Sequence, residues 1–294
     1  MDYFLQQMVN ALALGGTYAL LALGLAVIFS ILGLINFAHG ELMTITGYGL
    51  IFALATGVPY GGALICGVAL AVACAVAMER VAFRPVRRAS GTTMLLTSFA
   101  VSSILHTSFQ NFISARPKPV PVPDWLNQAF TLGGVQIGAI PSLSIAVTAV
   151  ALAGLAWFFH SVQIGLAMRA AAEDFAVARL MGIKANRVIS ASFAISGFLA
   201  AVAGILWLFQ RGSVDPLLGF VPVLKAFIAA VLGGLGSLGG AVLGGLILGI
   251  TEVMLRAYLP EGLLGFRDAI ALSLIIALLI AFPSGLMGRP IQAR

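Results

Sequence analysis

The chain has 294 residues, of which 61% are hydrophobic and 9% charged, and its mean hydropathy is +1.08. Soluble domains carry about a quarter charged residues, so this composition excludes a soluble globular protein and predicts an integral membrane protein. The formal net charge of +6 comes from segments beside apolar runs. It therefore bears on membrane orientation and anionic lipid, and it requires no nucleic-acid partner.

Apolar runs follow one another along the whole sequence, and most approach the length needed to span a bilayer. Because a spanning helix needs about 20 apolar residues, the chain has room for about eight to ten crossings. Continuous runs of this kind indicate helices rather than barrel strands. We therefore predict an all-α, polytopic fold in one transmembrane domain, residues 1–294. The runs lie at residues 8–35, 42–58, 61–83, 92–113, 140–160, 188–210, 220–235, 238–258 and 263–283.

The helical pattern breaks inside the membrane at residues 35–42, which read INFAHGEL. Asn36 suits an N-cap, and Glu41 would then lie in the first turn of the next helix, where the helix dipole favours a carboxylate. Polar and ionisable groups at such depth are candidates for a functional role. We expect Asn36, His39 and Glu41 to belong to a translocation pathway. The alternative is a structural role, with Glu41 held by the helix start and by His39.

A polar stripe runs along the apolar segment 92–113. Ser103, His106, Thr107 and Gln110 recur at i, i+3, i+4 and i+7, so they share one helix face. That face cannot point at lipid, because its hydrogen bonds would be unmade. The stripe either lines a pathway or bonds to neighbouring helices.

Basic residues predict the orientation of the chain, because they gather on the cytoplasmic side of membrane proteins. Placing residues 79–91, 165–187 and the tail after 283 inside collects ten of the sixteen basic residues, including Arg289 and Arg294. The C-terminus is then cytoplasmic and the proline-rich loop at 114–139 external. The side on which the N-terminus lies stays open.

The most charged window is residues 165–187, GLAMRAAAEDFAVARLMGIKANR, which lies between two apolar runs. Charge of this density cannot lie in hydrocarbon, yet the alanines favour a helix and Gly182 is a plausible helix stop. The segment reads either as a surface helix or as a docking element. Its charged residues include Arg169, Glu173, Asp174, Arg179 and Lys184.

A second break lies at residues 233–249, GGLGSLGGAVLGGLILG, where Gly236, Gly240 and Gly244 recur every fourth residue. This spacing lets another helix backbone approach closely, and a glycine-lined opening is the alternative. Both breaks precede a new helix, which suggests that two halves of the chain repeat one plan. Further along, Glu252 is expected to pair with Arg256 one turn away.

No reactive constellation can be assembled from the sequence. There is no Gly-Lys-Ser or Gly-Lys-Thr of a phosphate loop, no nucleophile with its base and no metal-binding cluster. Cys66 and Cys74 lie in one apolar run without acidic or histidine neighbours. We therefore expect a protein that is not an enzyme and that holds no cofactor of its own.

Four segments resemble a known family, the branched-chain amino acid ABC importer permeases of the LivH type. They are GLAVIFSILGLINFAHGELMTITGY (24–48), RAAAEDFAVARLMGIKANRVISASFAISGFLAAVAGIL (169–206), KAFIAAVLGGLGSLGGAVLGGLILGITE (225–252) and FPSGLMGRP (282–290). The resemblance covers nearly the whole chain, in order.

The resemblance implies a permease subunit in the bacterial inner membrane that moves branched-chain amino acids inward by ATP-driven alternating access. It makes residues 165–187 the cytoplasmic segment that couples to the ATPase. The implied coupling residues are Arg169, Glu173, Asp174, Arg179, Gly182 and Lys184. The implied partners are a LivM-like second permease, LivF-like and LivG-like ATPases that hold ATP and Mg, and a LivJ- or LivK-like binding protein. Urea, short amides or aromatic acids are alternative substrates within the family, and a stand-alone carrier or channel is the alternative of another class.

Overall fold

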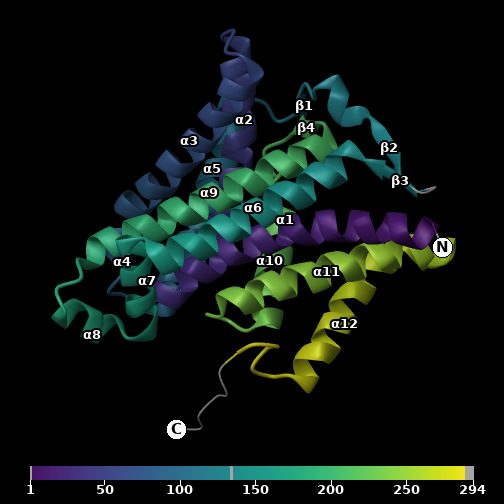
Figure 1. The fold of residues 1–294 in the computed structure, drawn as a ribbon. Coiled ribbons are helices and arrows are strands. Elements are labelled where there is room, and N and C mark those ends of the chain that lie inside the picture. Colours follow the sequence, from purple (N-terminus) through teal and green to yellow (C-terminus); the bar gives the residue numbers. More distant parts are fainter. Residues whose placement is uncertain (1, 133–134, 289–294) are drawn as a thin grey trace.

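The computed structural model describes residues 2–132 and 135–288, so Arg289 and Arg294 of the orientation argument lie outside the described residues. The predicted all-α membrane fold is confirmed (Figure 1). Every predicted apolar run coincides with a helix. In the described part of the chain, six helices are long and apolar enough to cross a membrane. They are α1 (Asp2–Leu32), α3 (Tyr60–Met78, continued by η2, Glu79–Phe83, and α4, Arg84–Val86), α6 (Ala139–Ser161), α9 (Ala185–Arg211), α11 (Leu238–Tyr258) and η4 with α12 (Glu261–Phe266 and Arg267–Ala281).

Three further helices fill the remaining predicted runs. Two are short, α2 (Glu41–Ala55) and α10 (Phe220–Gly233), while α5 (Gly91–Phe112) has spanning length but is too polar to count among the six. The connections add η1 (Phe37–His39), α7 (Gln163–Glu173), α8 (Phe175–Leu180), η3 (Asp124–Asn127) and four short strands, β1 (Lys118–Pro119), β2 (Ala129–Leu132), β3 (Val135–Gly138) and β4 (Ser213–Val214).

The helices α1 and α9 form the centre of the bundle. The apolar window of α1 is 83% buried within the chain and that of α9 is 61% buried, against 17% for α6 and 11% for α12. Helix α1 packs on α9, α10 and α11, and helix α9 packs on α1, α2 and α3. Because α6 and α12 bury so little within the chain, most of their surface is left for lipid or for another protein.

Glycines allow the closest helix contacts. A Cβ atom on Gly249 would fall on the backbone of Gly15, and one on Gly244 would fall on the carbonyl of Ala229, so α11 touches α1 and α10 backbone to backbone. Gly240 likewise lies against Gly233 of α10. Gly236 does not belong to this stripe, because it lies in the turn before α11 with a φ of 90°.

The molecule has two distinct ends. One, which we name the α7–α8 end, gathers the basic segment 79–88, the helices α7 and α8, and the last described residues at 283–288. The other end carries the start of α1, the ends of α9 and α11, and the proline-rich loop, whose β1 pairs antiparallel with β4. Among the described residues, the grouping predicted from the basic residues is therefore reproduced in space, and the start of α1 lies opposite α7 and α8.

An internal repeat relates the two halves of the bundle. Gly33 and Gly212 both adopt positive φ after a long central helix, and Gly57 and Gly236 both adopt positive φ after a short one. Each pair has the same separation in sequence (33 to 212, 57 to 236). The repeat unit is thus α1–α2–α3 in the first half and α9–α10–α11 in the second. The predicted match between the breaks at 35–42 and 233–249 is wrong, because at the same separation the structural equivalent of the first break is residues 214–221.

Candidate functional site

The short helices α2 and α10 begin at glycines that touch each other in the interior. A Cβ atom on Gly219 would fall on the carbonyl of Gly40, and one on Gly40 would fall on the carbonyl of Gly219. From this point α2 runs toward the end of α9, where Gly47 meets Val214, and α10 runs toward α7 and α8. The positive ends of two helix dipoles therefore converge inside the bundle. Broken helices of this kind form substrate sites in many transporters.

The residues of the first break are buried at this meeting point. Asn36 accepts a hydrogen bond from the amide of Ala38 (3.1 Å), and so caps η1 as predicted. His39 Nδ1 lies 2.9 Å from the Ser196 hydroxyl of α9, and the His39 ring packs on Gly24 of α1. These contacts join the break to both central helices.

Glu41 is the first residue of α2 and is almost fully buried. Its Oε1 accepts a hydrogen bond from Ser102 of α5 (2.8 Å), so Ser102 holds Glu41 where the structural alternative named His39. Its Oε2 has no hydrogen-bond partner among the described residues. No local pattern points to Ser102, because it lies one position before the polar stripe and far from Glu41 in sequence.

The polar stripe of α5 faces outward. Ser103 and Thr107 are exposed, and His106 and Gln110 are half-buried, whereas the buried hydroxyls of this helix belong to Ser98 and Ser102. The stripe therefore does not bond α5 to neighbouring helices of this chain. Because polar groups on a membrane helix cannot face lipid, the stripe must meet another protein or water.

Aromatic side chains link the stripe to the break. Phe37 of η1 stacks on Phe99 of α5 (ring centroids 4.5 Å apart) and meets Phe227 of α10 edge-on (5.4 Å). The sequence gives no local signal for this contact, because its three members come from distant segments. It places α5, η1 and α10 along one surface of the bundle.

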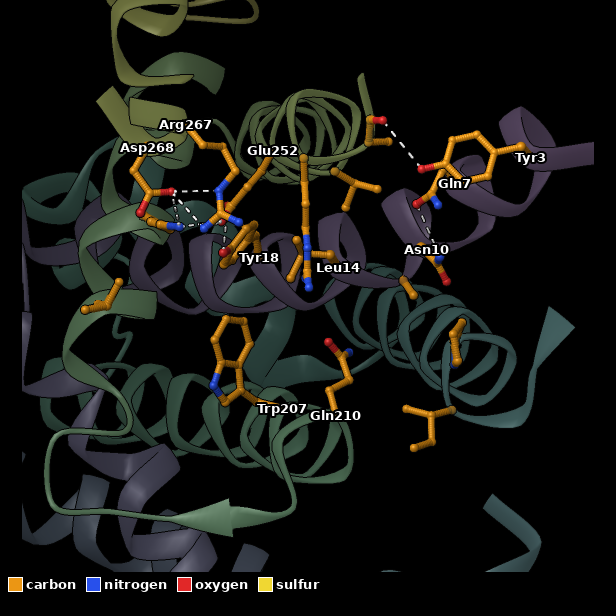
Figure 2. Close-up of a pocket in the computed structure, with 18 residues that line it drawn as sticks. Tyr3, Gln7, Asn10, Leu14, Tyr18, Trp207, Gln210, Glu252, Arg267 and Asp268 are labelled. Atoms are coloured by element: carbon orange, nitrogen blue, oxygen red, sulfur yellow. Dashed lines mark hydrogen bonds and ion pairs between the residues drawn. The ribbon is translucent and has the colours of Figure 1, made fainter. Parts of the chain in front are cut away.

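A cavity of about 840 Å³ opens at the other end, between α1, α6, α9, α10, α11 and α12 (Figure 2). Tyr18, Trp207, Glu252, Arg267 and Asp268 converge on one side of it, and Tyr3, Gln7 and Asn10 lie on the other. The Nε1 of Trp207 is buried without a hydrogen-bond partner in the described part of the chain. The cavity is thus polar and lined by both signs of charge.

Glu252 is held by a network across four helices. Lys225 of α10 lies 2.5 Å from its Oε1, Tyr18 of α1 donates a hydrogen bond to its Oε2 (2.9 Å), and Arg267 lies 3.9 Å away. Lys225 also lies 3.4 Å from Asp268 of α12. The predicted ion pair with Arg256 is wrong. Arg256 lines the same cavity, but the cations beside Glu252 come from α10 and α12.

The charged window 165–187 forms two helices at the α7–α8 end, where one was expected. Asp174 separates them, and its side chain caps α8 by accepting from the amides of Ala176 and Val177 (2.9 and 3.0 Å). Gly182 follows α8 with a φ of 85°. The tip of this segment is apolar and open, because Leu180 is 86% and Met181 80% exposed.

The expected contact residues lie on two sides of α7 and α8. Arg169 and Glu173 line a cavity with the end of α1 and with Gly236, whereas Arg179 and Lys184 line another with Arg87, Arg88 and Arg187. Among the described residues no group of three histidine, cysteine or acidic side chains could hold a metal ion.

Comparison with known proteins identifies the relatives of this chain. The family described as "Branched-chain amino acid transport system / permease component" matches residues 7–283. The chain is 38% identical to the high-affinity branched-chain amino acid transport system permease protein LivH of Escherichia coli K12, over 98% of this chain and 96% of that protein. It is 36% identical to the corresponding permease protein BraD of Pseudomonas aeruginosa, over 98% and 97%. A solved structure, PsaBC from Streptococcus pneumoniae in complex with Fab, aligns over 95% of this chain and 91% of its own with a TM-score of 0.49 and 12% identity.

Proposed function

Because the chain belongs to the family of branched-chain amino acid transport system permease components, we propose that it forms half of the membrane pathway of an ATP-driven importer. The chain is a multi-pass membrane protein and a permease subunit. Its proposed substrates are the branched-chain amino acids, because its relatives are described as branched-chain amino acid permeases. The substrate enters the cytoplasm by alternating access.

The observation that carries the proposal is the outward-facing polar stripe of α5 beside the buried half-helix starts. A lone carrier would enclose such a stripe in its own bundle, whereas Ser103 and Thr107 are exposed here. A second, LivM-like permease covers this surface, and the pathway runs between the two subunits along α5, η1 and α10. The aromatic contact of Phe37 with Phe99 suits an apolar side chain, and the converging helix dipoles suit a carboxylate.

Energy reaches this pathway from partners, because the chain has no phosphate loop. LivF-like and LivG-like ATPases bind ATP with Mg and close on it. The helices α7 and α8 are the coupling segment, and the exposed Leu180 and Met181 fit a cleft of the ATPase surface. Glu173 and Asp174 offer charge beside that apolar tip. The link to the pathway is direct, since α9 begins at Ala185 and carries Ser196, the partner of His39.

In this orientation the α7–α8 end and the C-terminus face the cytoplasm of the cell, and the membrane is the bacterial inner membrane. A LivJ- or LivK-like binding protein delivers substrate at the other end, where the 840 Å³ cavity opens. The Glu252 network ties α10 to α1, α11 and α12 there. When the subunits open outward, this network is the part of the chain that must rearrange.

Charge reversal tests the coupling segment. Replacing Glu173 and Asp174 together by lysine should abolish uptake while the protein remains inserted, because the ATPase no longer docks. Asp174→Asn is the matched control, since asparagine caps a helix as well as aspartate does. Radiolabelled leucine uptake and ATPase co-purification are the measurements. Normal uptake by the double lysine variant at normal expression would contradict the assignment.

Reconstitution tests the subunit composition and the substrate. Vesicles that hold all proposed subunits should take up leucine only with ATP and the binding protein, and vesicles with this chain alone should not. Uptake by the chain alone would establish a carrier instead. Unlabelled valine and isoleucine should compete with leucine for uptake. If urea, short amides or phenylalanine competed instead, the substrate would be another one of the family.

A further inference from the structure

A strongly basic cavity of about 760 Å³ lies at the α7–α8 end, apart from the pathway. Five cationic side chains line it, and no acidic side chain does. They come from the segment after α4, from α8 and from the start of α9. The five are Arg87, Arg88, Arg179, Lys184 and Arg187. Like charges at this density repel one another, so the site as built requires an anion.

The first turn of α9 adds to the positive electrostatic potential of this cavity. Lys184 is the N-cap of α9 and provides no side-chain hydrogen bond to the first amides of that 27-residue helix. The positive end of the helix dipole is therefore left for an external anion, at the place where the cations meet. Arg87 donates a hydrogen bond to Asn186 (2.6 Å), which fixes the segment after α4 against this turn.

The walls of the cavity identify the occupant. Ile31 and Leu32 at the end of α1 and Ile189 of α9 form an apolar side, and their helices continue into the membrane. A cavity lined by both cations and aliphatic side chains suits a phospholipid at the interface, whose headgroup is anionic and whose tails are apolar. The volume lies within the roughly 300–1,000 Å³ of small-molecule sites.

We propose that this cavity binds the phosphate headgroup of an anionic phospholipid. The lipid then bridges α4, α8 and α9 and holds the coupling segment against the ends of the spanning helices. An acidic surface of the ATPase is the competing occupant. It is disfavoured because the open apolar tip of the segment, Leu180 and Met181, already provides a docking face. The inference rests on the proposed function only in calling α7 and α8 the coupling segment, since the headgroup contacts are independent of transport.

The test uses the purified full-length chain and measures binding of phosphatidylglycerol and phosphatidylcholine by native mass spectrometry. The variant is Arg88→Gln with Arg187→Gln. Both side chains line the cavity and are exposed, so folding should persist. Each basic residue contributes roughly a fivefold gain in affinity, so phosphatidylglycerol binding should weaken roughly 30-fold with no change for phosphatidylcholine.

The matched control removes two exposed arginines elsewhere, Arg80→Gln with Arg116→Gln, and should leave phosphatidylglycerol binding within about twofold. Equal loss in the control, or unchanged binding in the cavity variant, would overturn the proposal. So would a cavity variant that keeps its lipid but no longer retains a co-expressed ATPase. Leucine uptake is not a readout here, so failure of the transport proposal would leave this result standing.

Discussion

The two halves of the bundle share one backbone path but carry different chemistry on it. In each half a long helix ends at a glycine with positive φ, an Asn or Asp accepts a hydrogen bond from the amide two residues on, and a short helix starts at a buried glycine. Asn36 has Asp215 as its equivalent, and Gly40 has Gly219. The backbone conformation is therefore set by a few glycines and by one capping Asn or Asp in each half. The other positions are free to diverge.

The divergence separates two kinds of buried charge. Glu41 of the first half has Phe220 as its equivalent, and Lys225 of the second half has Thr46. The first half thus buries a carboxyl group beside a hydroxyl, and the second buries an ammonium beside a carboxylate. One half carries an isolated polar contact near the pathway. The other carries an ion network that joins four helices.

The largest expected effect comes from breaking the feature that the halves share. In Gly219→Ala the new Cβ would clash with the carbonyl oxygen, the carbonyl carbon and the Cα of Gly40. These are backbone atoms and cannot rotate away. Overpacking typically costs about 1–3 kcal/mol, and a backbone clash lies at or above that limit. We expect little folded protein, measured by fluorescence-detected size exclusion after membrane extraction.

Gly154→Ala is the control, because a Cβ there meets nothing within 4 Å and alanine favours the helix. It should fold at least as well as the parent chain. Gly40→Ala should behave like Gly219→Ala, since each glycine blocks the other. If either variant at the contact were as stable as Gly154→Ala, the two helix starts would not touch.

A smaller loss is expected from breaking what only the second half has. Lys225→Met leaves the Glu252 carboxylate, 11% exposed, with the Tyr18 hydroxyl and with Arg267 at 3.9 Å. Removing one partner of a buried ion pair lowers the free energy of unfolding by about 3–5 kcal/mol. Because Arg267 still compensates part of the Glu252 charge, we expect a loss of about 3 kcal/mol. Thermal unfolding in detergent measures it.

The double variant Lys225→Met with Glu252→Gln should recover most of that stability, because no uncompensated charge remains. Thr46→Val makes the equivalent change in the first half. It removes only a hydrogen bond to the carbonyl of Leu42 in the same helix, so it should cost less than about 1 kcal/mol. Equal losses at 46 and 225 would mean that the network contributes nothing specific.

The elements of the fold were predictable because the bilayer imposes length and apolarity on each helix separately. The break at 35–42, the cap at Asn36 and the position of Glu41 at a helix start follow from local rules and are confirmed. The grouping of basic segments at one end follows from a rule that also needs no tertiary contact.

The contacts between distant segments were not predictable from local rules. Spacing on one helix predicts Arg256 as the partner of Glu252, yet its partners come from α10, α12 and α1. The repeat was suggested by the two breaks, but its register was wrong because the halves share few residues. Its signal was present in the equal spacing of the glycines, 33, 40 and 57 against 212, 219 and 236, which only a search for backbone-directed residues would detect.

The finest test exchanges the two capping residues. Asn36→Asp and Asp215→Asn both keep an oxygen that can accept from the amide two residues on, so the turn itself should survive. The environments differ. Asn36 is 1% exposed, whereas Asp215 is 16% exposed and pairs with a half-exposed Arg211 at 3.1 Å.

Asn36→Asp should therefore cost about 1–3 kcal/mol, because it buries a carboxyl group near Glu41 without a cation. Asp215→Asn should cost less than about 1 kcal/mol, since it loses one ion pair whose arginine is half-exposed. Unfolding curves of the two variants, recorded side by side, measure the difference. Equal costs would show that burial of the first break is not what distinguishes the halves. The expected order would place the pathway chemistry in the first half, on a backbone frame that the second half repeats without it.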